Sequence, residues 1–241
     1  MMRTAYICTM KALLISFFLI QGSLVFSQTE QDSILLLNGK VYHGEILGMD
    51  EVDYDSVVKY KTVDKKGVEK TEFIETYRIF SYTRGGTNHI LYYQDDFQGN
   101  YLSVAETKDV TMGSYDARKM FQPHFPFWSG FVLGLGASVW DTYVTKKQAA
   151  DTSLIVAPEA GFFNTKSPTI FPFFVPVVLS VTWALPTFKV KKKNMIHKEY
   201  FNNANYYRGY HRIAKQKRML GALVGGLAGV ASGMIIYYSV H

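Results

Sequence analysis

Apolar residues are gathered into four stretches of this chain, and an alternating region separates the first stretch from the second. The four stretches lie near residues 11–27, 125–140, 168–188 and 219–238. Between 28 and 120 the apolar positions occur in short runs rich in Val, Ile, Tyr, Phe and Thr. Runs of this kind are typical of half-buried strands. The pattern predicts an α+β membrane protein with a small soluble part and a long apolar part.

Short strands are predicted throughout residues 28–112, which we assign to a β domain. Asn38-Gly39 is a hairpin turn signal between two strand-like runs. Further strands are predicted near 52–62, 68–82 and 88–94. Short antiparallel strands joined by tight turns favour a small β-barrel of SH3-like or Sm-like shape.

The start of the β domain follows the pattern D-x-I-x-L-x-N-G-x-x-x-x-G-x-I. The pattern is formed here by Asp32, Ile34, Leu36, Asn38, Gly39, Gly44 and Ile46. It resembles the beginning of many small secreted bacterial β-domains, and the resemblance covers residues 32–46 alone. It implies a β fold in the cell envelope, and it implies no catalytic activity.

The N-terminus predicts a secretory signal peptide over residues 1–27. Lys11 supplies the positive n-region and residues 12–20 the apolar h-region, while Val25 and Ser27 occupy the −3 and −1 positions of a cleavage site. An uncleaved signal anchor is the alternative. Cleavage would leave the β domain outside the cytoplasm.

Residues 113–241 predict a helical membrane domain with two or three transmembrane helices. A short helix over 113–121 is expected to lead into it. The apolar segments are 126–143, 167–188 and 219–240, and a basic amphipathic linker, 189–218, precedes the last of them. Trp128 and Trp140 flank the first segment and suit the two bilayer interfaces. That segment is marginal in length, so it is either a span or an interfacial helix.

Three prolines interrupt the second apolar segment, at Pro172, Pro176 and Pro186. They predict a kinked helix or a re-entrant turn, since such breaks are tolerated where neighbouring groups satisfy the backbone. Broken helices also mark transport sites. The segment has no charged residue, which favours a proline-kinked anchor over a transport site.

Glycines recur every four residues in the last apolar segment, at Gly221, Gly225, Gly229 and Gly233. They share one helix face, which another backbone can approach closely because helices in lipid associate through such contact. The segment resembles the glycine-zipper segments of bacterial envelope proteins. Gly130 and Gly134 repeat the spacing once. Together, these six glycines are the predicted helix-packing residues.

A loose echo links the sequence before each of the two glycine-bearing segments. Gly113 and Ala117 precede the first segment much as Gly209 and Ala214 precede the last, although the offsets differ by one residue. If this echo is an internal repeat, the first and third apolar helices run in the same direction and can pack glycine to glycine.

Positive charge is concentrated in the basic linker, 189–218. The chain has a net charge of +6, and the linker holds ten Lys and Arg residues against the single acid Glu199. A basic block between apolar segments typically contacts anionic lipid headgroups. The residues assigned to lipid headgroups are Lys191, Lys192, Lys193, Arg212, Lys215, Lys217 and Arg218. Nucleic acid is the other use of such a patch, but an envelope location argues against it.

The predicted segments allow two membrane topologies, which differ in the number of transmembrane helices. With three spans the basic linker lies outside the cytoplasm, beside the β domain and against the positive-inside rule. With two spans the linker is cytoplasmic and obeys the rule. The inner membrane is favoured, and the outer membrane is the alternative because the rule has no force there.

Catalytic and metal motifs are missing from the sequence. Cys8 is the only cysteine, which excludes a disulfide framework and thiolate metal sites. There is no P-loop, G-x-S-x-G or H-E-x-x-H motif. We therefore expect a non-enzymatic scaffold or assembly component without a cofactor or metal. We expect its partners to be membrane lipids and either a second copy of itself or another envelope protein. A subunit of a small oligomeric transporter or channel is the alternative, and an enzyme comes third.

Overall fold

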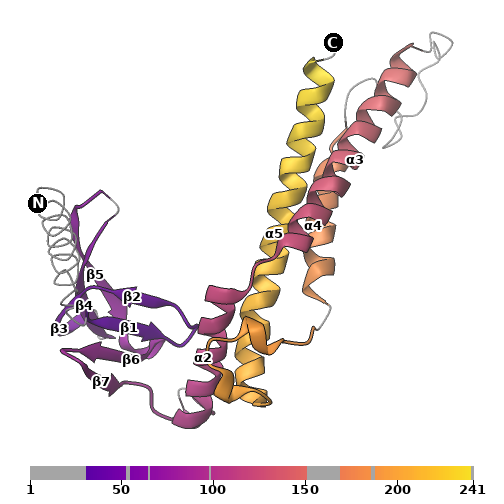
Figure 1. Cartoon of the computed structure of the whole chain (residues 1–241). Helices are drawn as coiled ribbons and strands as arrows, with labels where there is room; N and C mark the ends of the chain where they lie inside the picture. The colour runs from indigo at the N-terminus through magenta and orange to yellow at the C-terminus, as the bar shows by residue number, and fades with distance from the viewer. Residues whose placement is uncertain are drawn as a thin grey trace, which may run out of the picture.

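The computed structural model describes residues 31–52, 55–64, 66–97, 99–150, 169–185 and 188–239. The predicted signal peptide lies outside these residues. Within them the chain has an α+β fold, in which strands forming two antiparallel sheets are followed by four α-helices (Figure 1). The helices form an elongated rod, and the sheets lie beside its foot (Figure 1).

The strands before residue 91 form what we call the β module. Its four-stranded sheet has the order β2-β1-β6-β7 and contains β1 (Ser33–Leu36), β2 (Val41–His43), β6 (Ile79–Arg84) and β7 (Thr87–Ile90). Its three-stranded sheet has the order β3-β4-β5 and contains β3 (Glu45–Val52), β4 (Asp55–Val63) and β5 (Glu69–Glu75). Their shared core consists of Ile34, Leu36, Ile46, Val58, Tyr60, Ile74 and Ile79.

The predicted antiparallel strands are present, but the small SH3-like or Sm-like barrel is not closed, because the described strands form two separate sheets. The chain passes from one sheet to the other at Gly44, between β2 and β3, and again at the 3₁₀ turn Thr76–Arg78, between β5 and β6. That turn divides the single strand predicted over 68–82. At Gly44 a side chain would overlap the Lys61 carbonyl oxygen, so the crossing requires glycine.

Asp32 joins the crossing at Gly44 to the turn between β6 and β7. Its carboxylate accepts hydrogen bonds from the backbone N–H of Ile46, at 3.1 Å, and of Gly85, at 2.9 Å. Its carbonyl oxygen accepts another from the Gly44 N–H, at 3.1 Å. The first residue of the D-x-I-x-L-x-N-G pattern therefore has a structural role, because these bonds satisfy backbone groups at the Gly44 crossing and in the β6–β7 turn.

Helix α2 (Val104–Met120) begins well before the short helix predicted over 113–121. Ser103 and Glu106 form a capping box, in which the Ser103 side chain accepts from the Glu106 N–H and the Glu106 carboxylate accepts from the Ser103 N–H. The box satisfies N–H groups that the first helical turn leaves unpaired. The S-x-x-E signature is present in the sequence and was missed.

Three further helices form the rod. They are α3 (His124–Ala150), α4 (Phe171–Ala184) and α5 (Ala204–Ser239). Helix α5 has 36 residues and runs the length of the molecule, with α2 beside its first part and α3 beside its second (Figure 1). Helix α4 returns antiparallel to α3 and is continuous, with Pro172 at its start and Pro176 inside it. Residues 171–184 therefore form no re-entrant turn, and Pro186, the third proline of the predicted break, lies outside the described residues.

The β module contacts the helices through its first hairpin turn. Gly39 has φ +75°, and a Cβ there would overlap the backbone at Ser114 and Tyr115 of α2. The Arg118 side chain donates to the Asn38 carbonyl oxygen at 2.9 Å. The Asn-Gly turn thus requires glycine for both its conformation and its close approach to α2.

Candidate functional site

Glycines of α3 and α5 meet where these two parallel helices touch, a contact that we call the glycine seam. A Cβ at Gly225 would overlap the Phe127 carbonyl oxygen, and a Cβ at Gly130 would overlap the Ala222 carbonyl oxygen. Each helix supplies one glycine and one carbonyl to this pair of contacts. The two backbones therefore approach directly, with Cα hydrogens facing carbonyl oxygens.

The same reciprocal pair recurs one turn further along the seam. A Cβ at Gly229 would overlap the Phe131 carbonyl oxygen, and a Cβ at Gly134 would overlap the Gly226 carbonyl oxygen. The helices therefore stay in backbone contact over consecutive turns, which requires them to run in the same direction.

The remaining two glycines of the predicted packing face lie at the ends of the seam. A Cβ at Gly221 would lie 3.1 Å from the ring of Pro123, just before α3 begins. A Cβ at Gly233 would lie 2.6 Å from the Ser138 Cβ of α3. All six glycines that the sequence assigned to helix packing thus lie between α5 and the α3 side of the same chain.

The seam continues between α2 and α5. A Cβ at Gly113 would overlap the Tyr206 carbonyl oxygen, and a Cβ at Gly209 would overlap the Val110 carbonyl oxygen. This is again a reciprocal glycine–carbonyl pair. The echo noted around Gly113 and Gly209 in the sequence therefore corresponds to paired positions on two contacting helices.

Helix α4 has an opposite charge at each of its ends. The Asp141 carboxylate of α3 accepts from the Thr169 N–H at 2.8 Å and the Thr169 hydroxyl at 2.5 Å, just before α4 begins. At the other end the Arg218 guanidinium of α5 donates to the Trp183 carbonyl oxygen at 2.7 Å. An anion at a helix N-terminus and a cation at its C-terminus both complement the helix dipole. Asp141 and Arg218 thus hold α4 against its neighbours.

Three basic residues assigned to lipid headgroups donate to backbone carbonyl oxygens of this chain, and one of them, Arg212, is exposed. Arg218 is only 6% exposed and caps α4. Lys217 donates to the Phe121 carbonyl oxygen at 2.8 Å, beyond the end of α2, and Arg212 donates to the Leu37 carbonyl oxygen at 3.3 Å. These cations hold α2, α4 and the β module to α5.

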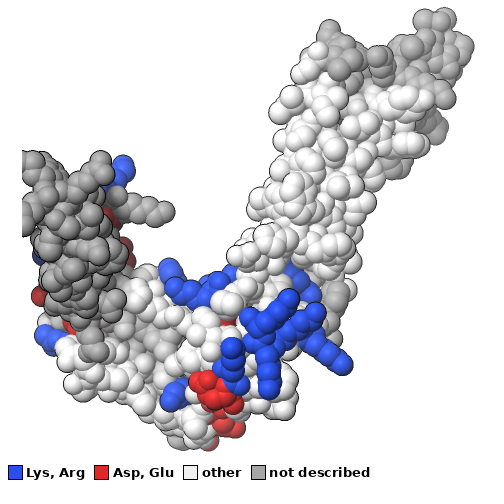
Figure 2. Space-filling model, viewed as in Figure 1, with Lys and Arg blue, Asp and Glu red and all other residues white. Residues whose placement is uncertain are grey.

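The other cations of the linker are differently placed. Lys191, Lys192 and Lys193 are exposed, and Lys215 is half-buried. Lysine and arginine side chains gather at the foot of the rod, and none is seen on the described face of the rod above them in this view (Figure 2). Headgroup contact stays a prediction for all seven basic residues.

A buried carboxylate that the sequence analysis missed fixes the basic linker. Asp116 of α2 is fully buried and accepts from the backbone N–H groups of Ile196 and His197, at 2.8 and 2.9 Å. It also accepts from the Tyr206 hydroxyl at 2.5 Å and lies 2.7 Å from the His197 Nδ1. A buried carboxylate is tolerated where hydrogen bonds satisfy it in this way. Asp116 therefore joins α2, the linker and α5.

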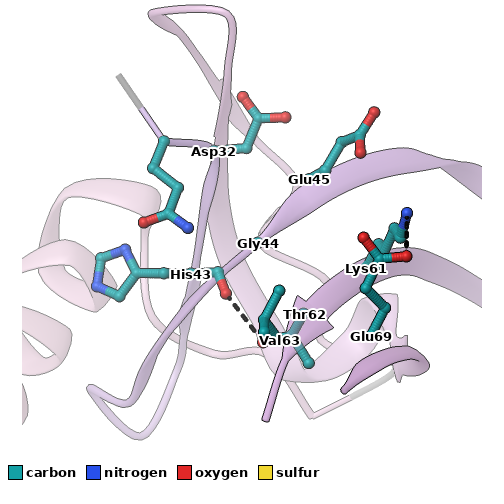
Figure 3. A pocket seen from close by; sticks show the side chains of 9 residues that line it. Asp32, His43, Gly44, Glu45, Lys61, Thr62, Val63 and Glu69 are labelled. Carbon is teal, nitrogen blue, oxygen red and sulfur yellow. Dashed lines mark hydrogen bonds and ion pairs between the residues drawn. The ribbon is translucent and has the colours of Figure 1, made fainter. Parts of the chain in front are cut away.

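An open, polar cavity of ≈ 650 Å³ lies where β2 and β3 meet β4 and β5 (Figure 3). Its walls include the exposed Lys61–Glu69 ion pair, at 2.7 Å, with His43 on the opposite side (Figure 3). Hydrogen bonding to Glu69 raises the pKa of Lys61. Because an exposed ion pair is weakly held and strongly hydrated, the arrangement gives no evidence of catalysis.

Among the described residues, no group of three His, Cys, Asp or Glu side chains is placed to hold a metal ion. Comparison with known proteins adds no assignment: no protein family, no curated protein and no solved structure matches this chain. The features that remain for a functional argument are the glycine seam, the basic linker and the apolar surface of the rod.

Proposed function

We propose that this protein is a non-enzymatic scaffold of the bacterial cell envelope, anchored in a membrane by its helical rod. The apolar outer surface of the rod carries the proposal. No charged residue occurs in 124–140, in α4, or in 219–239 of α5. Large apolar side chains are exposed on all three helices, among them Trp128, Val132, Phe174, Val178, Leu220 and Ile235. A surface like this favours lipid over water.

The length of the last helix supports a membrane position. Among the described residues, one helix, Ala204–Ile236, is long and apolar enough to cross a membrane, and Phe171–Ala184 is a shorter apolar helix. The uncharged part of α5, residues 219–239, has a rise of about 30 Å, which matches the hydrocarbon core of a bilayer. Helix α4 has 14 residues and a rise of about 21 Å, so its ends lie near Arg218 and Asp141 rather than at both membrane surfaces.

The position of the β module restricts topology. The Arg212–Leu37 and Arg118–Asn38 hydrogen bonds join the β module to the basic linker and α2 at one end of the rod. These contacts support the three-span arrangement, in which the β module and the linker share one side of the membrane, over the two-span arrangement, which separates them. With a cleaved signal peptide that side would be extracytoplasmic.

The scaffold reading draws on an exposed group of aromatic side chains between β7 and α2. Tyr93, Phe97 and Tyr101 are exposed there, and Phe97 is fully exposed. Exposed aromatic residues commonly anchor protein–protein interfaces. The rod would hold this surface at a fixed position because Asp116, Arg118 and Arg212 join the β module, α2 and α5.

The transporter alternative is less well supported by the same contacts. In the glycine seam the backbones of α3 and α5 meet directly, which leaves no polar path between these two helices. Asp141, the acid nearest the apolar segment of α3, binds Thr169. A homo-oligomer would have to build its pore from the outer faces of the rod.

Two measurements test the proposal in sequence. Membranes from cells producing the tagged chain are washed with alkaline carbonate, and the protein is expected to stay in the pellet; its release would refute the anchor. Cells are then treated with a crosslinker, and the protein is purified in mild detergent and analysed by mass spectrometry. One reproducible partner, lost in a Phe97→Ala variant, supports the scaffold. Recovery of the protein alone in defined multiples supports the oligomeric transporter.

A further inference from the structure

A cavity of ≈ 310 Å³ lies at the foot of the rod, between the basic linker and α5. We call it the foot pocket. Its lining residues include Phe188, Lys189, Phe201, Asn202, Tyr207 and His211. Three of these side chains are aromatic carbocycles and three carry nitrogen groups, so the pocket offers flat apolar walls together with hydrogen-bonding groups.

The foot pocket starts where the uncharged surface of the rod begins. The Phe188 ring lies 5.1 Å from the Arg218 guanidinium, and Arg218 immediately precedes the uncharged segment of α5. In the proposed membrane position this is the boundary between hydrocarbon and headgroups. Aromatic and basic side chains together are typical of that layer.

The electrostatics of the foot pocket favour an anion. Lys189 is exposed at its wall, and the Lys192 ammonium lies 4.3 Å from the ring of Phe201, which also lines it. The ten cations of the linker outnumber Glu199 and the two acids of α2 that contact the linker, Asp109 and Asp116. Several of those cations are bound to carbonyls, but carbonyls do not cancel their charge. The positive field therefore remains at the pocket.

A buried polar atom in the same wall is left without a partner. The His211 Nδ1 is buried and makes no hydrogen bond among the described residues. That nitrogen is enclosed by protein, so a ligand would reach it only after the ring turns. The His211 ring therefore contributes to the pocket as part of its wall on α5, 6.4 Å from the ring of Tyr207.

We propose that the foot pocket binds the phosphodiester headgroup of one anionic phospholipid. The Lys189 ammonium and the Asn202 amide would donate to phosphate oxygens, while Phe188 and Tyr207 would contact the glycerol region and direct the acyl chains along the rod. This inference rests on the proposed membrane anchor. It goes further in naming one lipid class and one site, in place of a diffuse attraction along the linker.

The test uses the full chain in a neutral detergent, with native mass spectrometry to count bound lipid. The protein is titrated with phosphatidylglycerol and, separately, with phosphatidylcholine of the same acyl chains. We expect saturable binding of one phosphatidylglycerol, and Lys189→Gln should weaken it about fivefold, the effect of one basic side chain near an anionic headgroup. Lys66→Gln, which removes an equal charge on the remote β4–β5 turn, should change nothing.

Three outcomes would overturn the inference. Equal affinity for the two lipids would show that the phosphate charge is not recognised, and an equal loss in Lys66→Gln would show diffuse attraction. Sodium phosphate displacing the lipid at equimolar concentration would show a site for free phosphate. The carbonate wash separates failure of the foot pocket from failure of the membrane anchor. A protein that stays in the washed membranes but shows no selective lipid binding would refute the foot pocket and leave the anchor standing.

Discussion

Because of the glycine seam, we expect alanine to lower the stability of the rod at Gly225 and to raise it at Gly136. At Gly225 an added Cβ would overlap the Phe127 carbonyl oxygen and lie 2.8 Å from the Phe127 carbonyl carbon and 3.1 Å from its Cα. These are backbone atoms, so α3 and α5 must separate. At Gly136 of α3 an added Cβ meets nothing within 4 Å among the described residues. Gly136→Ala is therefore a matched control in the same apolar surface.

The expected magnitudes follow from these contacts. Forcing extra volume into a packed contact costs about 1–3 kcal/mol, and backbone atoms on the opposing side place Gly225→Ala near the upper limit. Alanine recovers about 1 kcal/mol of helix propensity. The net loss in the free energy of unfolding is about 2 kcal/mol for Gly225→Ala, whereas Gly136→Ala gains about 1 kcal/mol. For a chain of 241 residues this lowers the melting temperature by about 4–8 °C in the first variant and raises it by about 2–4 °C in the second.

The assay is thermal unfolding of both variants in one detergent, followed by circular dichroism at the helix band. A third variant, Gly130→Ala, tests the reciprocal geometry, because it separates the helices at the same crossing. The double variant Gly130→Ala, Gly225→Ala should therefore lose less stability than the two single losses added together. Shifts of the same sign for Gly225→Ala and Gly136→Ala would refute direct backbone contact, and full additivity would refute the reciprocal pairing.

Three further predictions concern the foot of the rod. Asp116→Asn removes the negative charge on which three donors converge at Oδ2, so it should cost about 1–3 kcal/mol and expose the linker to limited proteolysis. An unchanged melting temperature would contradict the network. Gly39→Ala should release the β module from α2 and speed proteolytic cleavage between the β module and the helices. Gly67→Ala is the control, because Gly67 has a similar φ and no neighbour within 4 Å, so this variant should bear only the backbone strain. Equal cleavage rates in the two variants would rule out the close contact at Gly39. Hydrogen bonding from the Ser103 N–H lowers the pKa of Glu106 below the usual 4.5, so its stabilisation of α2 is complete above that pH and is lost as the pH falls through the lowered pKa. Glu106→Gln should flatten this part of the pH–stability curve, and an unaltered curve would exclude the capping box as its source.

The packing of α5 could be predicted from the sequence further than that of the β module. A four-residue glycine period places its members on one helix face whatever surrounds them, so a close helix contact follows from Gly221, Gly225 and Gly229 alone. Which carbonyl each glycine meets depends on where α3 begins after Pro123. Neither the partner nor its reciprocal geometry was therefore readable from residues 219–238.

The β module and the basic linker show what a local pattern omits. The alternation of apolar and polar residues predicted the strands. Which strands pair on either side of Gly44 depends on contacts between distant residues, so the sequence suggested a barrel where the structure has two sheets. In the sequence, Lys217 and Arg218 cannot be told apart from the exposed Lys191. They bind carbonyls only because the ends of α2 and α4 lie beside them in the fold. Asp116 gave no signal, because its donors come from residues 80 or more positions away.

The repeat of the glycine seam has a consequence for register. Sliding α5 along α3 by four residues, about 6 Å, would put Gly221 in the place of Gly225 and leave a glycine opposite the same carbonyl. The four glycines of this period thus fix how near α3 and α5 lie but do not by themselves choose which turn faces which. That choice comes from contacts that do not repeat: Gly209 against the Val110 carbonyl of α2, Gly226 against Pro176 of α4, and the Arg218 cap of α4. A slide by four residues would bring the side chains of Asn205 and Ala222 into the places of Gly209 and Gly226, so the register of α3 and α5 is set by α2 and α4.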